Sequence, residues 1–415
     1  MIESITIRSR FAAAAGAAVF VALFALAGTH EASAEGLRPE VGKPLQAAQD
    51  ALKAHRYADA MAKVREADNA SNKSGAESFT IERMRGAIAA ASGDTSTAIR
   101  SYEAIIASGK SPPGEQVRMV QAVAGMYYQA REYSKAATWT QRYFKEGGTD
   151  PQMRAILVQS YYLSGDCASV SRQVSGELQA EETGGRAPPE EQLQMLASCY
   201  QKNKDNNGFA SALEKLVAYY PKKEYWADLL SRVERKPNFS DRLALDVYRL
   251  KLATGLLTTP NDYMEMAQLA LGSDQTAEAK KIVDQGFASN VLGTGTDAAR
   301  QKRLRDLSVK RYAEAQATLA KDEVEAAGAR EGNDLVVLGY NTVGYGQAAK
   351  GIALMEQGIK KGGLRRPDDA KLHLGIAYLQ AGQKAKAIQT LKGVGGTDGT
   401  AELARLWMLQ ARRPA

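Results

Sequence analysis

The sequence has few of the residues that build metal and redox sites: three histidines and two cysteines in 415 residues. His55 and His373 have no second His or Cys at the spacing of zinc ligands, and His30 falls in the apolar N-terminal segment described below. We therefore expect no metal and no cofactor.

Catalytic and phosphate-binding motifs are also missing. Gly109-Lys110-Ser111 matches the end of a phosphate-binding loop, but the first glycine of that motif would fall at Ala104, inside an expected helix. Pro112 follows directly and opposes the helix that the motif requires. The chain has no GxSxG elbow and no carboxylate pair distinct from helix-surface charge. An enzyme is not expected.

The charge balance is mild for a chain of this length. Fifty-four basic residues against 47 acidic ones give a net charge of +7. Such an excess contributes to solubility and to the steering of partners. No recognition motif accompanies it, so no nucleic-acid partner is predicted.

The N-terminal apolar run, residues 11–27, is shorter than the roughly 20 residues of a spanning helix. Arg8 and Arg10 precede it and Ala32-Ser33-Ala34 follows, which is the pattern of a secretory signal. We predict that residues 1–34 are removed by cleavage after Ala34. The exported chain would then be periplasmic, with no membrane span after signal removal; the alternative is a transmembrane anchor.

Nothing in the chain alternates as strands do, and the clearest pattern is helical. In residues 368–394, apolar and small residues recur at the spacing of one helix face on both sides of Gly382, which breaks the pattern. They are Leu374, Gly375, Tyr378, Ala387, Leu391 and Val394. The pattern predicts two short amphipathic helices joined by a tight turn, with small residues where the helices touch.

This arrangement resembles a tetratricopeptide (TPR) repeat, a helical hairpin with a period of about 34 residues. The same pattern recurs at residues 86–105, 124–136 and 161–170, and is weak at 224–253 and 297–332. The resemblance implies an all-α protein, an α-solenoid of stacked TPR-like hairpins. Such a stack escapes the size limit of a single core, because each repeat packs only on its neighbours.

The pattern divides the chain into four parts. Residues 1–34 are the signal peptide, and 35–290 form an N-terminal TPR-like array. Residues 291–332 form a charged helical connecting segment, which we interpret as an irregular element; the alternatives are a solvated lid and a long helix along the stack. Residues 333–415 hold C-terminal repeats, and their last helix would be a cap with a polar outer face.

A binding groove is the function that the resemblance implies. The first helices of stacked hairpins line a concave surface on which a peptide or helix can lie. By the usual geometry of the repeat, the groove-facing positions are Gln121, Tyr128, Gln129, Gln159, Tyr162, Gln194, Gln201, Tyr340, Ile376 and Gln380. The alternative for each tyrosine is a packing role within the stack. The Lys/Asn pattern of a carboxylate clamp is missing.

Cys167 and Cys199 fall in consecutive hairpins. In an oxidising compartment two such cysteines can form a disulfide, provided that their Cα atoms lie within about 7 Å. The alternative is two buried free thiols that act as small apolar residues.

Residues 220–226, YPKKEYW, resemble part of the TPR proteins that accompany TonB-type systems of Gram-negative bacteria. This resemblance implies a non-catalytic periplasmic scaffold with protein partners in the cell envelope, supporting TonB-type uptake. An alternative is a TPR module in outer-membrane protein assembly, secretion or polysaccharide export. An enzyme or glycan-binding α-solenoid is the alternative of another class, and self-association through exposed repeat faces is a further one.

Overall fold

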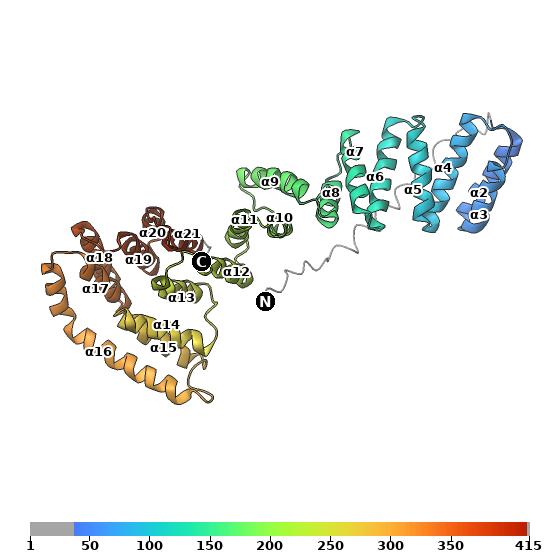
Figure 1. Cartoon of the computed structure of the whole chain (residues 1–415). Helices are drawn as coiled ribbons and strands as arrows, with labels where there is room; N and C mark the ends of the chain where they lie inside the picture. The colour runs from blue at the N-terminus through green and yellow to red at the C-terminus, as the bar shows by residue number, and fades with distance from the viewer. Residues whose placement is uncertain (1–36, 413–415) are drawn as a thin grey trace. The chain divides into compact units, whose positions relative to one another are not determined.

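The computed structural model describes residues 37–412 (Figure 1). These residues form twenty α-helices and one short 3-10 helix, and no strand occurs among them. The predicted all-α class is confirmed. The predicted signal peptide and its cleavage site after Ala34 lie outside the described residues.

The chain divides into two compact units between Gly184 and Gly185. In the first unit each helix packs against the next one in sequence, so that four TPR-like hairpins stack in order (Figure 1). Its helices are α2 (Pro39–Lys53), α3 (Tyr57–Asp68), α4 (Gly75–Ser92), α5 (Thr95–Ala107), α6 (Pro113–Gln129), α7 (Tyr133–Lys145), α8 (Pro151–Ser164) and α9 (Cys167–Thr183).

Every hairpin of this unit turns through one residue in the left-handed conformation. Gly93 (φ 80°) and Gly165 (φ 82°) fill this position in two hairpins, and His55 (φ 57°) and Arg131 (φ 60°) fill it in the other two. The next amide donates to the carbonyl five residues back, as in Asp94 N to Ala89 O at 2.9 Å. This geometry is the Schellman ending of a helix, and it starts the second helix at a fixed direction.

The second unit contains the remaining helices, again packed largely in sequence order. They are α10 (Glu190–Lys202), α11 (Asn206–Tyr219), α12 (Lys223–Glu234), the 3-10 helix η2 (Asp241–Leu243), α13 (Ala244–Ala253), α14 (Pro260–Gly272), α15 (Thr276–Ala288), α16 (Ala298–Gly328), α17 (Asn333–Gly344), α18 (Ala348–Lys361), α19 (Pro367–Gln380), α20 (Lys384–Lys392) and α21 (Thr400–Ala411). Its hairpins repeat the left-handed turn at Lys204, Asp274, Gly346 and Gly382. The prediction of an α-solenoid built from TPR-like hairpins is confirmed.

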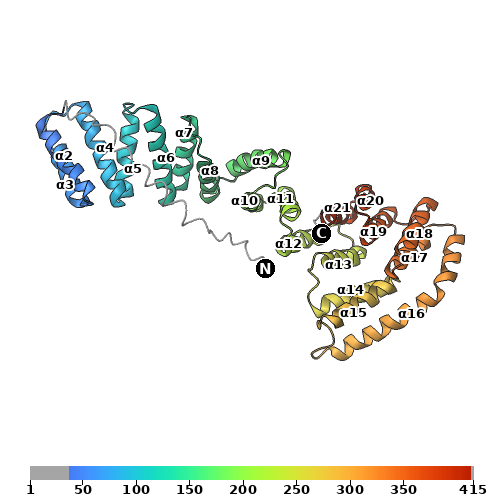
Figure 2. The ribbon, with the colours of Figure 1, turned by 180° about the vertical axis from the view of Figure 1, so that it is seen from behind.

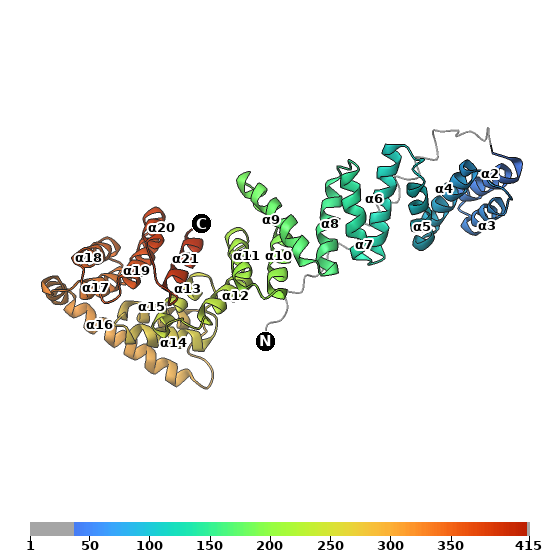
Figure 3. The same cartoon turned by 45° about the horizontal axis from the view of Figure 1, so that its top comes forward.

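The last helix, α21, packs on more of the second unit than its neighbours in sequence. It packs on α19 and α20 and also on α11 and α13, which precede it by more than 140 residues (Figure 3). Trp407 is 6% exposed, and Arg405, expected on a polar outer face, pairs with Glu214 of α11 at 2.9 Å. The 236–240 loop supports this closure, because Ser240 N donates to Asp398 O at 2.9 Å. Arg405 and Arg412 nevertheless remain exposed, so one side of the last helix still carries polar residues.

These contacts place the boundary between units at 184/185 rather than at the expected 290/291. Residues 185–290 contribute helices that the C-terminal helices cover, so they belong with the C-terminal repeats. The repeat pattern is weak at 224–253 because α12 and α13 do not pack mainly on each other as the two helices of a hairpin. Instead α12 packs mainly on α11, and α13 packs on α14 and α21. Sequence periodicity shows which face of a helix is buried but does not show which helix covers it.

The charged tract is one continuous helix rather than an irregular element. α16 spans 31 residues and packs on α14, α15 and α17 along the edge of the second unit (Figure 2). Its inward residues recur at helical spacing and include Gln301, Leu304, Ser308 and Ala326, all of them buried. Of the alternatives, the structure has the long helix that lies along the stack.

Close approach between α17 and α18 depends on glycine. A Cβ added at Gly339 would lie 2.6 Å from the carbonyl oxygen of Gly351 and 2.9 Å from the amide nitrogen of Met355. The expected use of small residues where helices touch is confirmed here and at Gly375, where a Cβ would lie 2.6 Å from Leu391.

We predict that Gly339→Ala destabilises the second unit by roughly 1–3 kcal/mol, because the added methyl group meets backbone atoms that cannot move independently. Gly125, in the interior of α6, has no atom within 4 Å of an added Cβ. Gly125→Ala is therefore expected to stabilise the first unit by about 0.5–1 kcal/mol. Thermal unfolding followed by circular dichroism measures both, and a stabilised Gly339→Ala protein would contradict this account.

Cys167, the first residue of α9, is 5% exposed, and Cys199 of α10 is fully buried. The pairing of these two cysteines stays a prediction from the sequence. We predict that the intact mass of the non-reduced monomer is about 2 Da below its fully reduced mass, since one disulfide replaces two thiols. Alkylation without reductant should modify neither cysteine, and a protein carrying two labels would contradict the pairing.

Candidate binding surfaces

The first helices of the hairpins in the first unit are joined by side chains. Arg83 of α4 pairs with Glu115 of α6, Nη2 to Oε1, at 2.8 Å. Tyr128 of α6 donates from its hydroxyl to Gln159 Oε1 of α8 at 2.7 Å. Tyr128 and Gln159 are both predicted groove residues, and the structure brings them together. Their positions are fixed by contacts across repeats, and both remain partly exposed.

Gln121 has a more structural role than expected. Its Nε2 donates to Asp150 Oδ2 at 2.8 Å, while Asp150 Oδ1 accepts from the amide of Gln152 and so caps α8. Gln121 thereby connects α6 to the first turn of α8. Among the other positions predicted in this unit, Gln129 is exposed and Tyr162 is partly exposed.

In the second unit two predicted groove positions are not groove-facing. Tyr340 is 5% exposed and Ile376 is 1% exposed. Ile376 packs inside the hairpin stack, and Tyr340 is covered by the buried charged groups described next. Gln194 is partly exposed and donates to the hydroxyl of Tyr225 at 2.5 Å. The remaining two, Gln201 and Gln380, are exposed.

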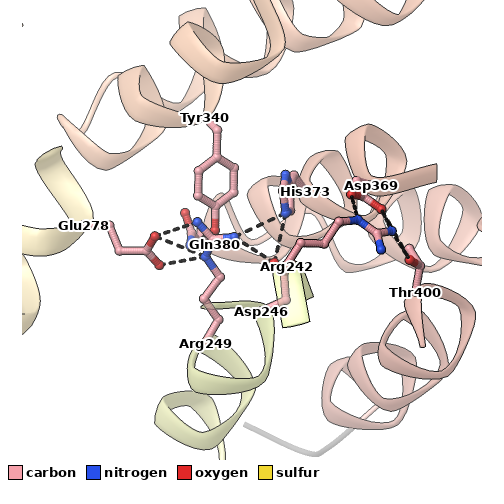
Figure 4. Close-up of polar contacts among 9 residues, drawn as sticks. All are labelled: Arg242, Asp246, Arg249, Glu278, Tyr340, Asp369, His373, Gln380 and Thr400. Atoms are coloured by element: carbon pink, nitrogen blue, oxygen red, sulfur yellow. Dashed lines mark hydrogen bonds and ion pairs between the residues drawn. The ribbon is translucent and has the colours of Figure 1, made fainter. Parts of the chain in front are cut away.

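A buried charged cluster holds α13, α15, α17 and α19 together (Figure 4). Arg249 of α13 is 5% exposed and lies at its centre. Its Nη2 donates to Glu278 Oε2 of α15 at 2.6 Å, and its Nη1 donates to Asp246 Oδ1 at 2.7 Å. The guanidinium carbon lies 4.6 Å from the centroid of the Tyr340 ring on α17. His373 of α19 completes the set, with Nε2 2.9 Å from Asp246 Oδ1.

The electrostatics of this cluster compensate for its burial. Burial alone would raise the pKa of Asp246, but the charges and hydrogen bonds of His373 and Arg249 outweigh it and hold that pKa well below the ordinary value. For Arg249 the directions are reversed: burial lowers the pKa, but the negative charges of Glu278 and Asp246 raise it by more. The pKa of Arg249 is therefore well above its ordinary value. Both groups therefore stay charged, as a buried pair must to avoid an isolated charge.

A second polar cluster connects η2 to the C-terminal helices (Figure 4). Arg242 forms two parallel hydrogen bonds to Asp369 of α19, at 2.9 and 2.8 Å. Its Nη2 also lies 2.7 Å from Oδ2 of Asp398, a residue that precedes α21 in the sequence. Burial would raise the pKa of Asp398, but bonds from Thr400 and Arg242 lower it to about 2. The bidentate arginine geometry fixes direction as well as distance.

A cleft of about 710 Å³ lies beside Arg242, between η2, α13, α14 and the start of α16. Leu245 and Met264 supply apolar surface, and Glu265 and Arg300 supply exposed charge of opposite sign. Arg242 reaches the cleft with its charge already matched by Asp369 and Asp398. The cleft therefore carries no strong excess of either sign.

The Asp246–His373 pair has the distance of a catalytic dyad but not its surroundings. A nucleophilic triad also needs a hydroxyl or thiol within hydrogen-bond distance of the imidazole. None of the described residues supplies one to His373, whose Nε2 contacts Asp246 and Arg249. Within residues 37–412 no group of three His, Cys, Asp or Glu side chains is placed to hold a metal ion. The cluster connects helices.

The YPKKEYW segment at 220–226 also has a packing role. Trp226 is fully buried and Tyr225 is 3% exposed. The Tyr225 hydroxyl donates to Glu190 Oε1 at 2.5 Å, and Lys222 pairs with the same carboxylate at 2.6 Å. These contacts join the start of α12 to α10. In the segment that carries the TonB-type resemblance, Tyr225 and Trp226 thus face the interior, while Tyr220 is partly exposed.

No family model and no curated protein matches the chain. Among solved structures, the chain is similar to the structure of Naa15/Naa10 bound to HypK-THB, with 16% identity and a TM-score of 0.32 over 85% of this chain. It spans 57% of the length of that protein. It is also similar to yeast Tom70, with 11% identity and a TM-score of 0.24 over 89% of this chain and 95% of that one. At these TM-scores neither similarity supports an argument about partners. No helix in the described part of the chain is long and apolar enough to cross a membrane.

We predict that Asp246→Asn lowers the free energy of unfolding at pH 7 by about 1.5–3 kcal/mol, since Arg249 keeps Glu278 but loses a charged hydrogen-bond partner. The folded-state pKa of Asp246 is depressed, so its contribution is complete above the unfolded pKa of about 3.9 and declines as the pH falls. The deficit of the variant should therefore shrink by about 1 kcal/mol between pH 7 and pH 3.

Urea unfolding of both proteins at each pH measures this difference. Asp59→Asn is the matched control, because the Asp59 side chain is 64% exposed and pairs only at 3.6 Å with Arg56. It should change stability by less than about 0.5 kcal/mol. An Asp246→Asn deficit that is the same at both pH values would mean that the carboxylate charge is not what stabilises the cluster.

Proposed function

We infer that this protein is a non-catalytic scaffold that binds another protein chain along the first helices of its N-terminal hairpins. The observation that carries this function is the Tyr128–Gln159 contact between α6 and α8. A partly exposed aromatic side chain offers apolar area together with a polar end, and here its rotamer is set before a partner arrives. Such preorganisation reduces the entropy that binding costs.

The compartment and pathway are a proposal from the sequence. The N-terminal signal pattern supports export to the periplasm, and the YPKKEYW resemblance supports a TonB-type uptake system. A module of outer-membrane protein assembly, secretion or polysaccharide export uses the same kind of surface and is the second candidate. The repeat architecture is compatible with both, so the partner decides between them.

The test is affinity capture of the tagged exported protein after mild crosslinking, with the captured proteins identified by mass spectrometry. Inner-membrane motor components of the TonB type are the expected result. Outer-membrane assembly or polysaccharide-export proteins in their place would overturn the uptake role and establish the second candidate. Capture of no envelope protein above the untagged control would overturn both.

We predict that Tyr128→Ala combined with Gln159→Ala weakens partner binding about tenfold or more, as loss of a central aromatic contact does at protein interfaces. Thr138→Ala on α7 is the control, because Thr138 is exposed and hydrogen-bonds only within its own helix. Binding of the identified partner is measured by calorimetry, with circular dichroism to verify folding. A folded double variant that binds as tightly as the parent would exclude this surface.

A further inference from the structure

The long helix α16 carries its charges in two blocks of opposite sign. Residues 298–311 contain six cations and one anion, and residues 312–328 contain one cation and four anions. The cations of the first block are Arg300, Lys302, Arg303, Arg305, Lys310 and Arg311. The anions of the second block are Glu314, Asp322, Glu323 and Glu325.

This distribution is the reverse of what stabilises a helix. The N-terminal end of a helix has a partial positive charge that favours acidic residues, and the C-terminal end favours basic ones. α16 has no acidic residue in its first turn and no basic residue in its last, and Asp297 makes no side-chain capping bond. The segregated charges therefore give the ends of the helix little stabilisation, and a contact outside the helix would give them a role.

Partners within the chain neutralise only part of the basic block. Arg305 pairs with Asp284 at 3.2 Å, and Lys302 pairs with Asp306 at 2.8 Å. Lys310 and Arg311 approach Glu314 only at 3.8 and 3.9 Å, and Arg303 is exposed with no ion pair in the structure. Most of this charge remains available at the surface.

Helix α16 lies along the edge of the second unit (Figures 1 and 2). Its face away from α14 and α15 is exposed and apolar in its second half. Val324 is 73% exposed, an unusual value for a valine in a helix, and Val309 is 43% exposed. Ala313, Ala317 and Ala320 share this exposed face with Val324, at steps of four and three residues. That spacing is the seam along which two helices pack, and alanine lets them approach closely.

We propose that this face of α16 binds α16 of a second copy of the chain, with the two helices antiparallel. The helix is about 46 Å long at 1.5 Å per residue, and its centre is Ala313. Antiparallel pairing about that centre sets the basic block of each copy against the acidic block of the other, and Ala317 and Val324 of each helix then lie opposite Val309 and Lys302 of the other. The arrangement is self-complementary, as a two-fold symmetric interface must be.

Charge favours this occupant over an anionic membrane. A membrane-surface helix combines one apolar face with basic residues along its length. Here the acidic block would be repelled by the same lipid that attracts the basic block. A parallel pair is excluded as well, because it would set like blocks against each other.

The test exchanges the charges. The variant Arg303→Glu/Lys310→Glu/Arg311→Glu changes the net charge of the first block from +5 to −1, and Glu314→Lys/Glu325→Lys changes the net charge of the second block from −3 to +1. Each variant alone places like charges across the interface, so we expect dimerisation to weaken at least about tenfold relative to the unmodified chain. Mixed in equal amounts, the two variants restore opposite charges at both ends of the pair, and a heterodimer should form.

Analytical ultracentrifugation of the full exported chain at increasing concentration gives the result, with circular dichroism as a check on helix content. Recovery of the dimer mass only in the mixture supports the proposal, and weakening of the unmodified dimer by salt agrees with it. An unmodified chain that stays monomeric, or one that dimerises equally well in both variants, overturns it. Monomeric protein that sediments with vesicles containing anionic lipid, but not with neutral ones, overturns it in favour of the membrane.

Discussion

Each hairpin of this protein depends on one residue whose backbone takes the left-handed conformation between two helices. The amide that follows closes the first helix on a carbonyl five residues back, and the second helix then starts in a fixed direction. Glycine adopts this conformation without cost, but His55, Arg131, Lys204 and Asp274 also adopt it. Since non-glycine residues rarely do so, packing between the paired helices has to offset the local strain.

This constraint also explains which repeats could be recognised from the sequence. The hairpins that turn at Gly93, Gly165 and Gly382 have a visible break in the helical pattern, and the all-α class and TPR-like repeats follow from it. The turn at Asp274 has no such marker, and its position follows from the helices on either side. Periodicity also predicts which small residues lie between paired helices. Where two helix backbones approach closely, only a residue with little or no side chain fits between them.

The buried charges of the second unit could not be predicted in this way. Arg249, Asp246 and His373 look like ordinary helix-surface residues in the sequence, because amphipathic helices carry charge on most of their exposed positions. They become partners only when α13 packs against α19, which brings together Asp246 and His373, 127 residues apart in the sequence. For the same reason the usual geometry of the repeat predicts groove positions for Tyr340 and Ile376, which are buried in the structure. Tyr128 and Gln159 lie on neighbouring hairpins with regular repeats, and the structure brings their side chains together.

The return of α21 onto α11 and α13 changes how the second unit can be made. In an open repeat array, folding can begin at any repeat and spread to its neighbours. Here Lys236 contacts Glu402, 166 residues further along the chain, so the ribosome has to synthesise the chain beyond Glu402 before this unit can close. Contacts of such long sequence separation slow folding. The first unit needs only local pairings and carries no such delay, so the two halves of one chain mature on different timescales.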